Sequence, residues 1–287
     1  RLRLEVEQAV APRFVRFLTT QVDVQPKAQG TEYPWMVMGW GQFGRGHLID
    51  YGICFSEDDV REVLEPLRVY EHEDGGVIRT KWSCIDSSDG ATQEDVYRIS
   101  RSIRFCVPVK GMSLNNPEAF KLSAIDEAGR RADGGRSMWE RLMTGGETLL
   151  VGVNTDFTQS WLEQQFHGKD VAPESRFTIC VDASMNSDLL DEFLNETPIF
   201  GVNKSGLKTT GWERRDSHRP NDMRDLVRYG KTMAQLLTDN GRHWESLPNR
   251  PTPEQIKVEK EKARRTRKRP AEKTASSITS GGGRQWE

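Results

Sequence analysis

Residues 16–24 read RFLTTQVDV, and they predict a β-strand that closes on the carboxylate of Asp23. The stretch Thr80–Ile85 (TKWSCI) repeats this arrangement, because it is also strand-like and is followed directly by Asp86. An aspartate just past a hydrophobic strand lies at the carboxyl edge of the sheet, where α/β proteins place their chemistry. The two stretches therefore predict a sheet with two carboxylates at one edge.

The segments around these two strands extend the expected sheet. Trp35–Gly41 (WMVMGWG) and His47–Cys54 (HLIDYGIC) are apolar runs between clusters of Gly, Pro and Gln, which is typical of an antiparallel meander. Glu57–Leu67 predicts an amphipathic helix. Gln93–Ser102 predicts a second helix and Phe105–Val109 a further strand. Together with the strand before Asp86, they predict a parallel crossover added to the meander.

The middle of the chain is less regular. Residues 112–146 are weakly patterned and rich in glycine, so we expect a long surface excursion with one short helix near Met138–Met143. Glu147–Asn154 (ETLLVGVN) then predicts a strand. A helix over Thr155–Phe166 follows, and we expect Asn154 or Thr155 to cap it.

Three further elements are expected before the C-terminal tail. Leu189–Leu194 predicts a short helix, Ile199–Trp212 a β-hairpin around a Lys-Ser-Gly turn, and Asn221–Leu237 a long helix. The resulting division of the chain is an N-terminal linker over residues 1–15, a folded domain over residues 16–247 and a tail after it.

The tail, residues 248–287, differs from the rest in composition. Lys257–Lys273 alone carries nine Lys and Arg against three Glu, whereas the whole chain has 41 basic and 43 acidic residues. The body is therefore acidic, which is unusual for a nucleic-acid binder unless divalent cations neutralise part of its charge. The Pro-, Lys-, Arg- and Ser-rich tail predicts a disordered segment that acts in binding rather than in chemistry.

Composition also excludes several classes of protein. The chain contains no run of about 18 apolar residues, so no membrane span is expected. Its four cysteines are widely spaced and lie in apolar stretches, which predicts buried, reduced thiols. Because no histidine pairs with a cysteine at finger spacing, a zinc site is not expected.

A third aspartate, Asp225, lies near the start of the last expected helix. Carboxylates from three distant segments can converge on hard divalent cations, which demand oxygen ligands. Asp222 lies three residues earlier on the same helix face, and Asp50 and Asp89 are further candidates. Taken singly, each aspartate is better explained as the cap of a turn or helix start, so the pattern alone does not choose among them.

The order of these pieces resembles the nuclease domain of the large subunit of lambda-like phage terminases. The pieces that match are FLTTQVDVQ, VMGWG, GHLIDYG, CIDSSDG, VYRISR, VPVKG, LLVGVNTDFTQSWLEQQF and RPNDMRDLVRYGKTMAQLL, and they cover roughly residues 14–240. In the last piece the family has an Asn four residues before its metal-binding Asp, which favours Asp225 over Asp222. Two features depart from the family. Ser88-Asp89 replaces frequent glycines, and no G-x-x-x-x-G-K-[ST] motif for ATP hydrolysis is present.

The resemblance implies an RNase H-like α/β fold, with a mixed five-stranded sheet flanked by helices and the β-hairpin as an insertion. It implies a metal-dependent DNA endonuclease in which two Mg²⁺ or Mn²⁺ ions, about 3.5–4 Å apart, assist hydrolysis of a phosphodiester. Asp23 would bridge both ions, and Asp86 and Asp225 would each hold mainly one. Asp89 and Asp222 are additional candidate ligands.

The resemblance also implies the partners and the setting. Double-stranded DNA would be the substrate, cut from concatemers in the host cytoplasm, with the terminase small subunit and the portal or procapsid as protein partners and no membrane. Basic residues would grip the DNA backbone: Lys110, Lys204, Lys208, Arg214 and Arg215. Two alternatives stay open: a docking module with a weak or dead site, and another RNase H-like nuclease such as a resolvase.

Overall fold

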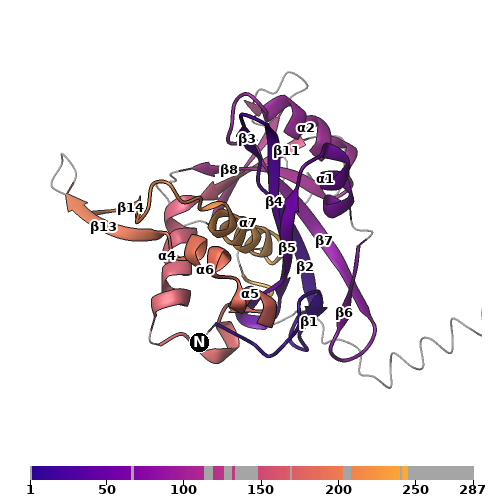
Figure 1. The fold of residues 1–287 in the computed structure, drawn as a ribbon, viewed down its shortest axis with the longest axis vertical. Coiled ribbons are helices and arrows are strands. Elements are labelled where there is room, and N and C mark those ends of the chain that lie inside the picture. Colours follow the sequence, from indigo (N-terminus) through magenta and orange to yellow (C-terminus); the bar gives the residue numbers. More distant parts are fainter. Residues whose placement is uncertain are drawn as a thin grey trace, which may run out of the picture. The chain divides into compact units, whose positions relative to one another are not determined.

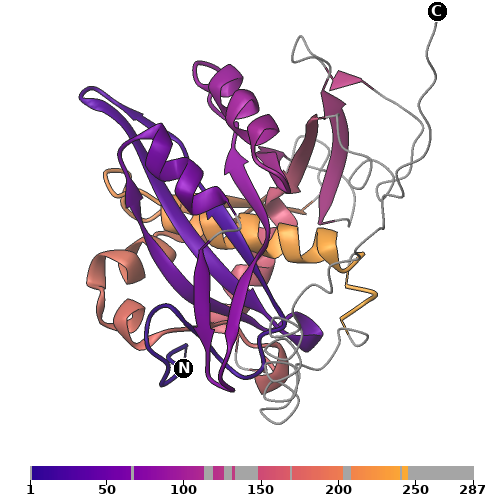
Figure 2. The ribbon, with the colours of Figure 1, turned by 90° about the vertical axis from the view of Figure 1, so that its right-hand side faces the viewer.

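The computed structural model describes residues 2–65, 68–112, 119–125, 131–132, 148–168, 170–202, 208–239 and 241–244. Contacts divide the chain into two units, residues 1–250 and residues 251–287, and the described residues all belong to the first. The expected tail therefore lies outside the described residues. The first unit is a mixed sheet with helices on both faces (Figures 1 and 2).

Five strands form the centre of the sheet. Their spatial order is β5 (Gly46–Cys54), β4 (Gly30–Trp40), β2 (Phe17–Val22), β7 (Val77–Asp86) and β8 (Cys106–Met112). β4 is antiparallel to β2 and β5, whereas β2, β7 and β8 are mutually parallel neighbours. The antiparallel meander and the parallel crossover through α2 (Gln93–Ser102) are both confirmed.

Side-chain alternation decides which face of this sheet carries the two strand-end aspartates. On β2, Leu18 and Val22 face one hydrophobic core, so Gln21 and the following Asp23 face the other. On β7, Ile85 belongs to the first core and Cys84 to the second, which places Asp86 on the same face as Asp23. Because β2 and β7 are parallel neighbours, the two carboxylates reach the same edge.

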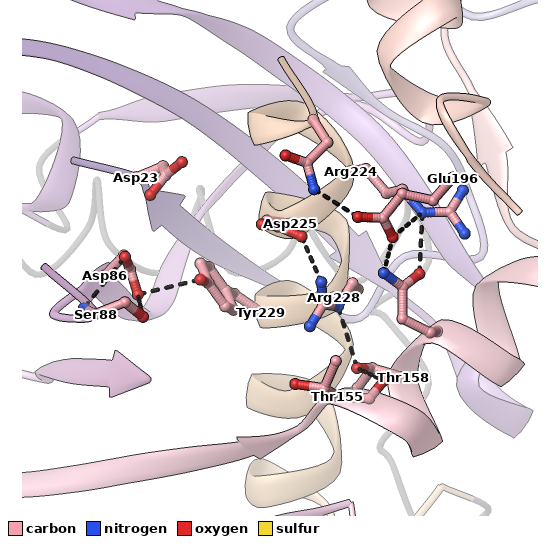
Figure 3. A network of polar contacts seen from close by, with 12 residues as sticks. Asp23, Asp86, Ser88, Thr155, Thr158, Glu196, Arg224, Asp225, Arg228 and Tyr229 are labelled. Atoms are coloured by element: carbon pink, nitrogen blue, oxygen red, sulfur yellow. Dashed lines mark hydrogen bonds and ion pairs between the residues drawn. The ribbon is translucent and has the colours of Figure 1, made fainter. Parts of the chain in front are cut away.

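The long helix α7 (Asp222–Leu237) crosses this face and packs on β2 and β4. Gly230 permits the close approach, because a Cβ atom there would lie 2.6 Å from Met38 Sδ and 3.1 Å from Gln21 Cδ. This close contact holds α7 against β2 and β4 at Gly230. As a result its first turns, with Asp225 and Tyr229, lie beside the ends of β2 and β7 (Figure 3).

The remaining helices divide between the two faces. α4 (Thr155–His167) and α6 (Ser187–Phe193) share the core that holds α7, whereas α1 (Glu57–Leu64) packs on the opposite face together with α2. Asn154 caps α4, since its side chain accepts a hydrogen bond from the Phe157 amide. The helix expected over residues 57–67 ends at Leu64, and residues 66–67 lie outside the described residues.

The sheet of the described residues is larger than the five strands expected, because it contains twelve. In the excursion expected over residues 112–146, β9 (Phe120–Ile125) is a regular strand that pairs antiparallel with β11 (Thr148–Asn154), so the expectation of a mainly surface segment is corrected there. Phe120 on this strand is buried in the hydrophobic core. The helix expected near residues 138–143 lies outside the described residues.

Short strands account for most of the remaining difference. They are β1 (Val10–Ala11), β3 (Gln25–Lys27), β6 (Val69–His72), β10 (Arg131–Ala132) and β12 (Thr178–Ile179). The other short elements are α5 (Val181–Met185) and the 3₁₀ turns Gln42–Gly44 and Pro173–Ser175. Segments of two to four residues are too short to show an alternating pattern. The stretch expected as a linker over residues 1–15 contributes β1 and buries Ala11 and Val15.

The expected hairpin forms a separate two-stranded sheet, β13 (Glu196–Val202) and β14 (Lys208–Arg214). Figure 1 shows it extending away from the body, with its base next to α6 and the start of α7. Its turn, residues 203–207, lies outside the described residues. Among the described helices none is both long and apolar enough to cross a membrane.

Candidate active site

An open pocket of about 420 Å³ lies where the ends of β2 and β7 meet the start of α7. Four carboxylates line it: Asp23, Asp86, Asp222 and Asp225. Three cationic side chains, Lys27, Arg214 and Arg219, line the same pocket. The three aspartates selected from the sequence are thus brought together, with Asp222 beside them.

Asp23 follows β2 directly and is 4 % exposed. Its Oδ1 accepts a hydrogen bond from the Val24 amide at 2.8 Å, and its Oδ2 accepts one from Gln25 Nε2 at 2.7 Å. Both donors are neutral and come from the next two residues. They orient the carboxylate without neutralising its charge.

Asp86 is the last residue of β7 and is 6 % exposed. Its Oδ1 accepts hydrogen bonds from Ser88 Oγ at 2.8 Å and from Tyr229 OH at 3.1 Å, and its Oδ2 accepts one from the Ser88 amide at 3.3 Å. The Tyr229 contact joins the end of β7 to the second turn of α7 (Figure 3). Burial and the neighbouring carboxylates raise the pKa of Tyr229 well above its usual value, so the phenol keeps its proton and donates.

Asp225 and Asp222 come from the first turn of α7. Asp225 is partnered by the guanidinium of Arg228, one turn further along the same helix. Arg228 also donates from Nε to Thr158 Oγ1 on α4 at 3.4 Å, so this cation is tied to the protein interior. Asp225 therefore has one internal counter-charge, whereas neither Asp23 nor Asp86 forms an ion pair with another described residue.

The pKa values of the pocket carboxylates are raised, in each case chiefly by burial. Burial raises the pKa of Asp23 well above its usual range, and the charges of Asp86, Asp222 and Asp225 raise it further. Burial also raises the pKa of Asp86, against the opposing hydrogen bonds from Ser88 and Tyr229. The pKa of Asp225 rises to about 6, mainly through burial, although Arg228 lowers it. The pocket thus holds more negative charge than the surrounding protein compensates.

The donor set of the pocket fits a hard divalent cation. The groups facing it are carboxylate oxygens, with no thiol and only one imidazole, His218, among the described lining residues. Within the described part of the chain, no three His, Cys, Asp or Glu side chains already converge on one ion position. Mg²⁺ typically uses one or two carboxylates, keeps several waters and takes phosphate oxygens from a substrate. The open arrangement suits that mode better than a closed protein cage.

Two other aspartates considered from the sequence do not line the pocket. Asp89 accepts hydrogen bonds from the Ala91 amide at 3.1 Å and from Thr92 Oγ1, and so caps the turn before α2. Asp50 is buried elsewhere, where it accepts from Gln8 Nε2 at 2.6 Å and pairs with Arg68 at 2.8 Å. Their carboxylates are occupied by these local contacts.

The basic residues considered from the sequence are spread out. Arg214 lines the pocket, but the neighbouring Arg215 does not. Lys110 follows Val109, the residue that pairs with Asp86 on the next strand, so alternation places its side chain on the opposite face of the sheet. Lys204 lies outside the described residues, and of Lys208 only the backbone in β14 is described.

Sequence reasoning did not select Lys27, Gln25 or Tyr229, although all three line the pocket. Lys27 and Gln25 lie on the short strand β3, which directly follows Asp23. Proximity in sequence to Asp23 was the available indication for both. No local pattern identifies Tyr229, because its role depends on the packing of α7 against β7.

Comparison with known proteins gives one match. The family model for the terminase large subunit gpA endonuclease domain matches residues 1–244, which include every carboxylate of the pocket. Searches of curated proteins and of solved structures found no match.

Proposed function

Since the chain belongs to the terminase large subunit gpA endonuclease domain family, we propose that it cuts DNA during phage genome packaging and that the carboxylate pocket is its active site. The observation that carries the proposal is the meeting of Asp23, Asp86 and Asp225 from three separate elements. Burial raises the pKa of each of the three, and neighbouring aspartates raise those of Asp23 and Asp225 further, which is costly for folding alone. Groups perturbed in this way cluster at functional sites.

The arrangement of the central strands supports an RNase H-like fold as part of this proposal. A meander of β2, β4 and β5 is followed by β7 and β8, each parallel to β2, in the order β5-β4-β2-β7-β8. In chain order, Asp23 directly follows the first of these five strands and Asp86 ends the fourth.

The proposed cofactors are two Mg²⁺ or Mn²⁺ ions, held by Asp23, Asp86 and Asp225, with Asp222 as an additional ligand. When bound, such ions supply an activated water and stabilise the leaving oxygen in phosphodiester hydrolysis. The mainly carboxylate donor set and the excess negative charge support this assignment. The structure offers a weaker case for Asp89, whose carboxylate caps a turn.

The other lining residues have distinct tasks in this proposal. Gln25 orients Asp23, and Ser88 and Tyr229 orient Asp86 through the hydrogen bonds described above. Lys27 and Arg214 bind backbone phosphates of the DNA next to the site of cleavage. The pocket combines the buried carboxylates of Asp23 and Asp86 with the exposed cations of Lys27 and Arg214. This arrangement suits a phosphodiester whose charge is partly neutralised by divalent ions.

The biological setting follows from the family. We propose double-stranded concatemeric DNA as the substrate, the terminase small subunit and the portal or procapsid as partners, and the host cytoplasm as the location. Lys204, Lys208 and Arg215, which lie within or next to the hairpin in sequence, are proposed to add contacts to the DNA backbone. Lys110 is a weaker candidate, because its side chain lies on the face of the sheet opposite the pocket.

Plasmid cleavage tests the proposal directly. Supercoiled plasmid is incubated with the 287-residue chain in Mg²⁺, in Mn²⁺ and in EDTA, and then with Asp86→Asn in each condition. We expect nicked and linear products only for the unmodified chain with a divalent ion. Cleavage in EDTA, or equal cleavage by Asp86→Asn, would remove the two-metal assignment. A chain that binds DNA but never cuts it would instead favour the docking alternative.

A further inference from the structure

We propose that Asn221 and Glu196 are positioning residues that hold the Arg214 guanidinium at the wall of the active-site pocket, ready to bind a DNA phosphate. This inference rests on the proposed nuclease function and adds a mechanism for orienting the substrate. The three residues belong to the base of the hairpin and the start of α7. Two hydrogen bonds connect those two elements, and Figure 3 shows Glu196 close to Asp225.

The hairpin register brings Glu196 and Arg214 opposite each other. They are the first residue of β13 and the last residue of β14, and they are direct cross-strand partners. Opposite charges at such a position normally interact directly across the strands. Here the Asn221 side chain bridges them instead, and no ion pair joins Glu196 to Arg214 among the described residues. Arg214 thus has no ion-pair partner among the described residues, although its charge lowers the pKa of Asp222.

Asn221 has the right groups to act as this bridge. Its Oδ1 accepts a hydrogen bond from Arg214 Nη2, and its Nδ2 donates to Glu196 Oε1 at 2.7 Å. The opposite amide orientation would set an NH₂ group against a guanidinium and an oxygen against a carboxylate, so the two charged partners fix the amide. Asn221 is also the N-cap residue of α7, yet its side chain makes no capping hydrogen bond. A residue type favoured for capping is used here for another contact.

Glu196 is itself held rigidly. It is 8 % exposed, its Oε2 accepts a hydrogen bond from Gln159 Nε2, and the same oxygen lies 3.3 Å from Arg224 Nε. Arg224 is fully buried and also donates to Gln159 Oε1 at 3.0 Å and to the Phe193 carbonyl. Both carboxylate oxygens are therefore used, and Glu196 cannot turn without breaking several buried contacts.

Arg214, by contrast, is exposed and lines the pocket. In the described part of the chain its guanidinium is bound only by Asn221, and no pocket carboxylate lies within ion-pair distance of it. An unsupported arginine would sample many rotamers, including ones that pair with Asp222 or Asp225. Fixing one end of the guanidinium reduces the entropy lost on binding and leaves the other N–H groups for a phosphate. The geometry points to a phosphate of the cleaved DNA strand as the ligand.

A double-mutant cycle tests the inference. Cleavage of plasmid at saturating Mn²⁺ is compared for the full chain and for Arg214→Ala, Asn221→Ala and the double variant. Loss of one hydrogen bond to a charged group corresponds to roughly a 10- to 100-fold loss in kcat/KM, and we expect each single variant to show it. The double variant should be no slower than Arg214→Ala alone, because both changes remove the same function. Additive losses would overturn the inference.

Salt dependence separates the charge of Arg214 from the orientation of its guanidinium. DNA binding is measured in EDTA across a series of salt concentrations. Arg214→Ala should make the log–log slope shallower by about 0.9, the effect of one lost phosphate contact. Asn221→Ala should leave the slope unchanged, because the arginine charge remains although its orientation is lost. A slope altered equally in both variants would contradict a positioning role for Asn221.

Two controls separate the possible failures. Arg79→Ala changes an exposed arginine near the start of β7, which does not line the pocket, and should cleave within a few-fold of the unmodified chain. Asn221→Ser retains a side chain that favours helix starts and should be as slow as Asn221→Ala, and full activity in this variant would assign the loss to helix capping instead. Absence of cleavage by the unmodified chain would overturn the proposed function and this inference together. Normal cleavage with additive losses would overturn this inference alone.

Discussion

Two buried polar clusters lie side by side at the start of α7, and they handle charge in opposite ways (Figure 3). The carboxylate cluster, formed by Asp23, Asp86, Asp222 and Asp225, has Arg228 as its one ion-pair partner within the described residues. The Glu196 network consists of Glu196, Asn221, Gln159 and Arg224, and there each charged group has a charged or polar partner.

The difference supports the proposal that the carboxylate cluster binds a ligand. A buried charge without a partner costs free energy, and a fold keeps it only where something else compensates. The Glu196 network is compensated within the chain, so it can hold neighbouring groups in place. The carboxylate cluster is compensated only in part, and binding of divalent cations would supply the remainder. Changes in the carboxylate cluster should therefore reduce activity without reducing stability, whereas changes to the buried ion pair of the Glu196 network should reduce stability.

The largest expected effect is on cleavage when the carboxylate cluster is changed. Asp23→Asn and Asp86→Asn should each lower the cleavage rate by at least ~10²-fold, the scale seen when one charge-stabilising group is removed from an active site. Thermal unfolding in EDTA should show a midpoint equal to or above that of the unmodified chain, since like charges no longer repel. A lower unfolding midpoint in either variant would contradict the prediction that these carboxylates serve cleavage rather than stability.

Changes to the buried ion pair of the Glu196 network should instead lower the free energy of unfolding. Arg224→Met removes one partner of a buried ion pair and leaves Glu196 uncompensated, which typically costs about 3–5 kcal/mol. Urea unfolding should show that loss both with and without Mg²⁺, because the network lies outside the proposed metal site. Glu163→Gln provides a control, since this partly exposed residue lies 3.9 Å from Arg224 Nη2 and is expected to contribute little. Equal losses for the two variants would show that the network is not the source of stability.

The sequence predicted the carboxylate cluster better than the Glu196 network, for a physical reason. Asp23 and Asp86 follow strands with a recognisable apolar pattern, and sheet geometry alone brings parallel neighbours to one edge. Asp225 needed the resemblance to a family, because Asp222 fits the local pattern equally well. Glu196 and Arg224 are joined only through the packing of the hairpin, α4 and α7, and no local periodicity contains that information.

The same distinction applies to the fold. The central strands and the helices α2 and α7 have long periodic patterns, and they lie where those patterns predict. The strand β9 was missed, because its apolar residues lie in a glycine-rich stretch and its pairing with β11 is a long-range contact. Asp89 illustrates the limit for sites, since only the structure shows that its carboxylate is used by the turn before α2.

A pH titration should distinguish the clusters by an effect of intermediate size. The pKa of Asp225 in the folded protein is about 6, above the value of about 4 expected in an unfolded chain, so the folded state binds this proton more tightly. Its contribution to stability is fully present below pH 4 and is lost as the pH rises through 6. Without metal, the unfolding free energy should therefore fall by on the order of 2 kcal/mol between these limits.

Asp225→Asn isolates this contribution from the other groups that titrate in the same range. We expect the difference in unfolding free energy between this variant and the unmodified chain to change with pH in EDTA, with the asparagine variant relatively more stable near pH 7. Saturating Mg²⁺ should remove most of the difference at pH 7, since the ion then stabilises the ionised carboxylate. A difference that stays constant from pH 4 to 7 would refute the perturbed carboxylate.

The smallest expected effect concerns Arg228, the ion-pair partner of Asp225. It pairs with Asp225 and lies in the buried interior beside α4, so it withholds part of the carboxylate charge from a metal ion. Arg228→Met should raise the pKa of Asp225 further, because Arg228 lowers it. At a pH well above this pKa the ionised carboxylate would lack its internal competitor, and the half-maximal Mg²⁺ concentration for cleavage should fall by about two- to fivefold, the scale of a single modest ion pair. Arg228→Lys retains the charge and should leave this concentration nearly unchanged. If Arg228→Met instead required more Mg²⁺, Arg228 would serve chiefly to orient Asp225 toward the ion, and its charge would matter less than its geometry.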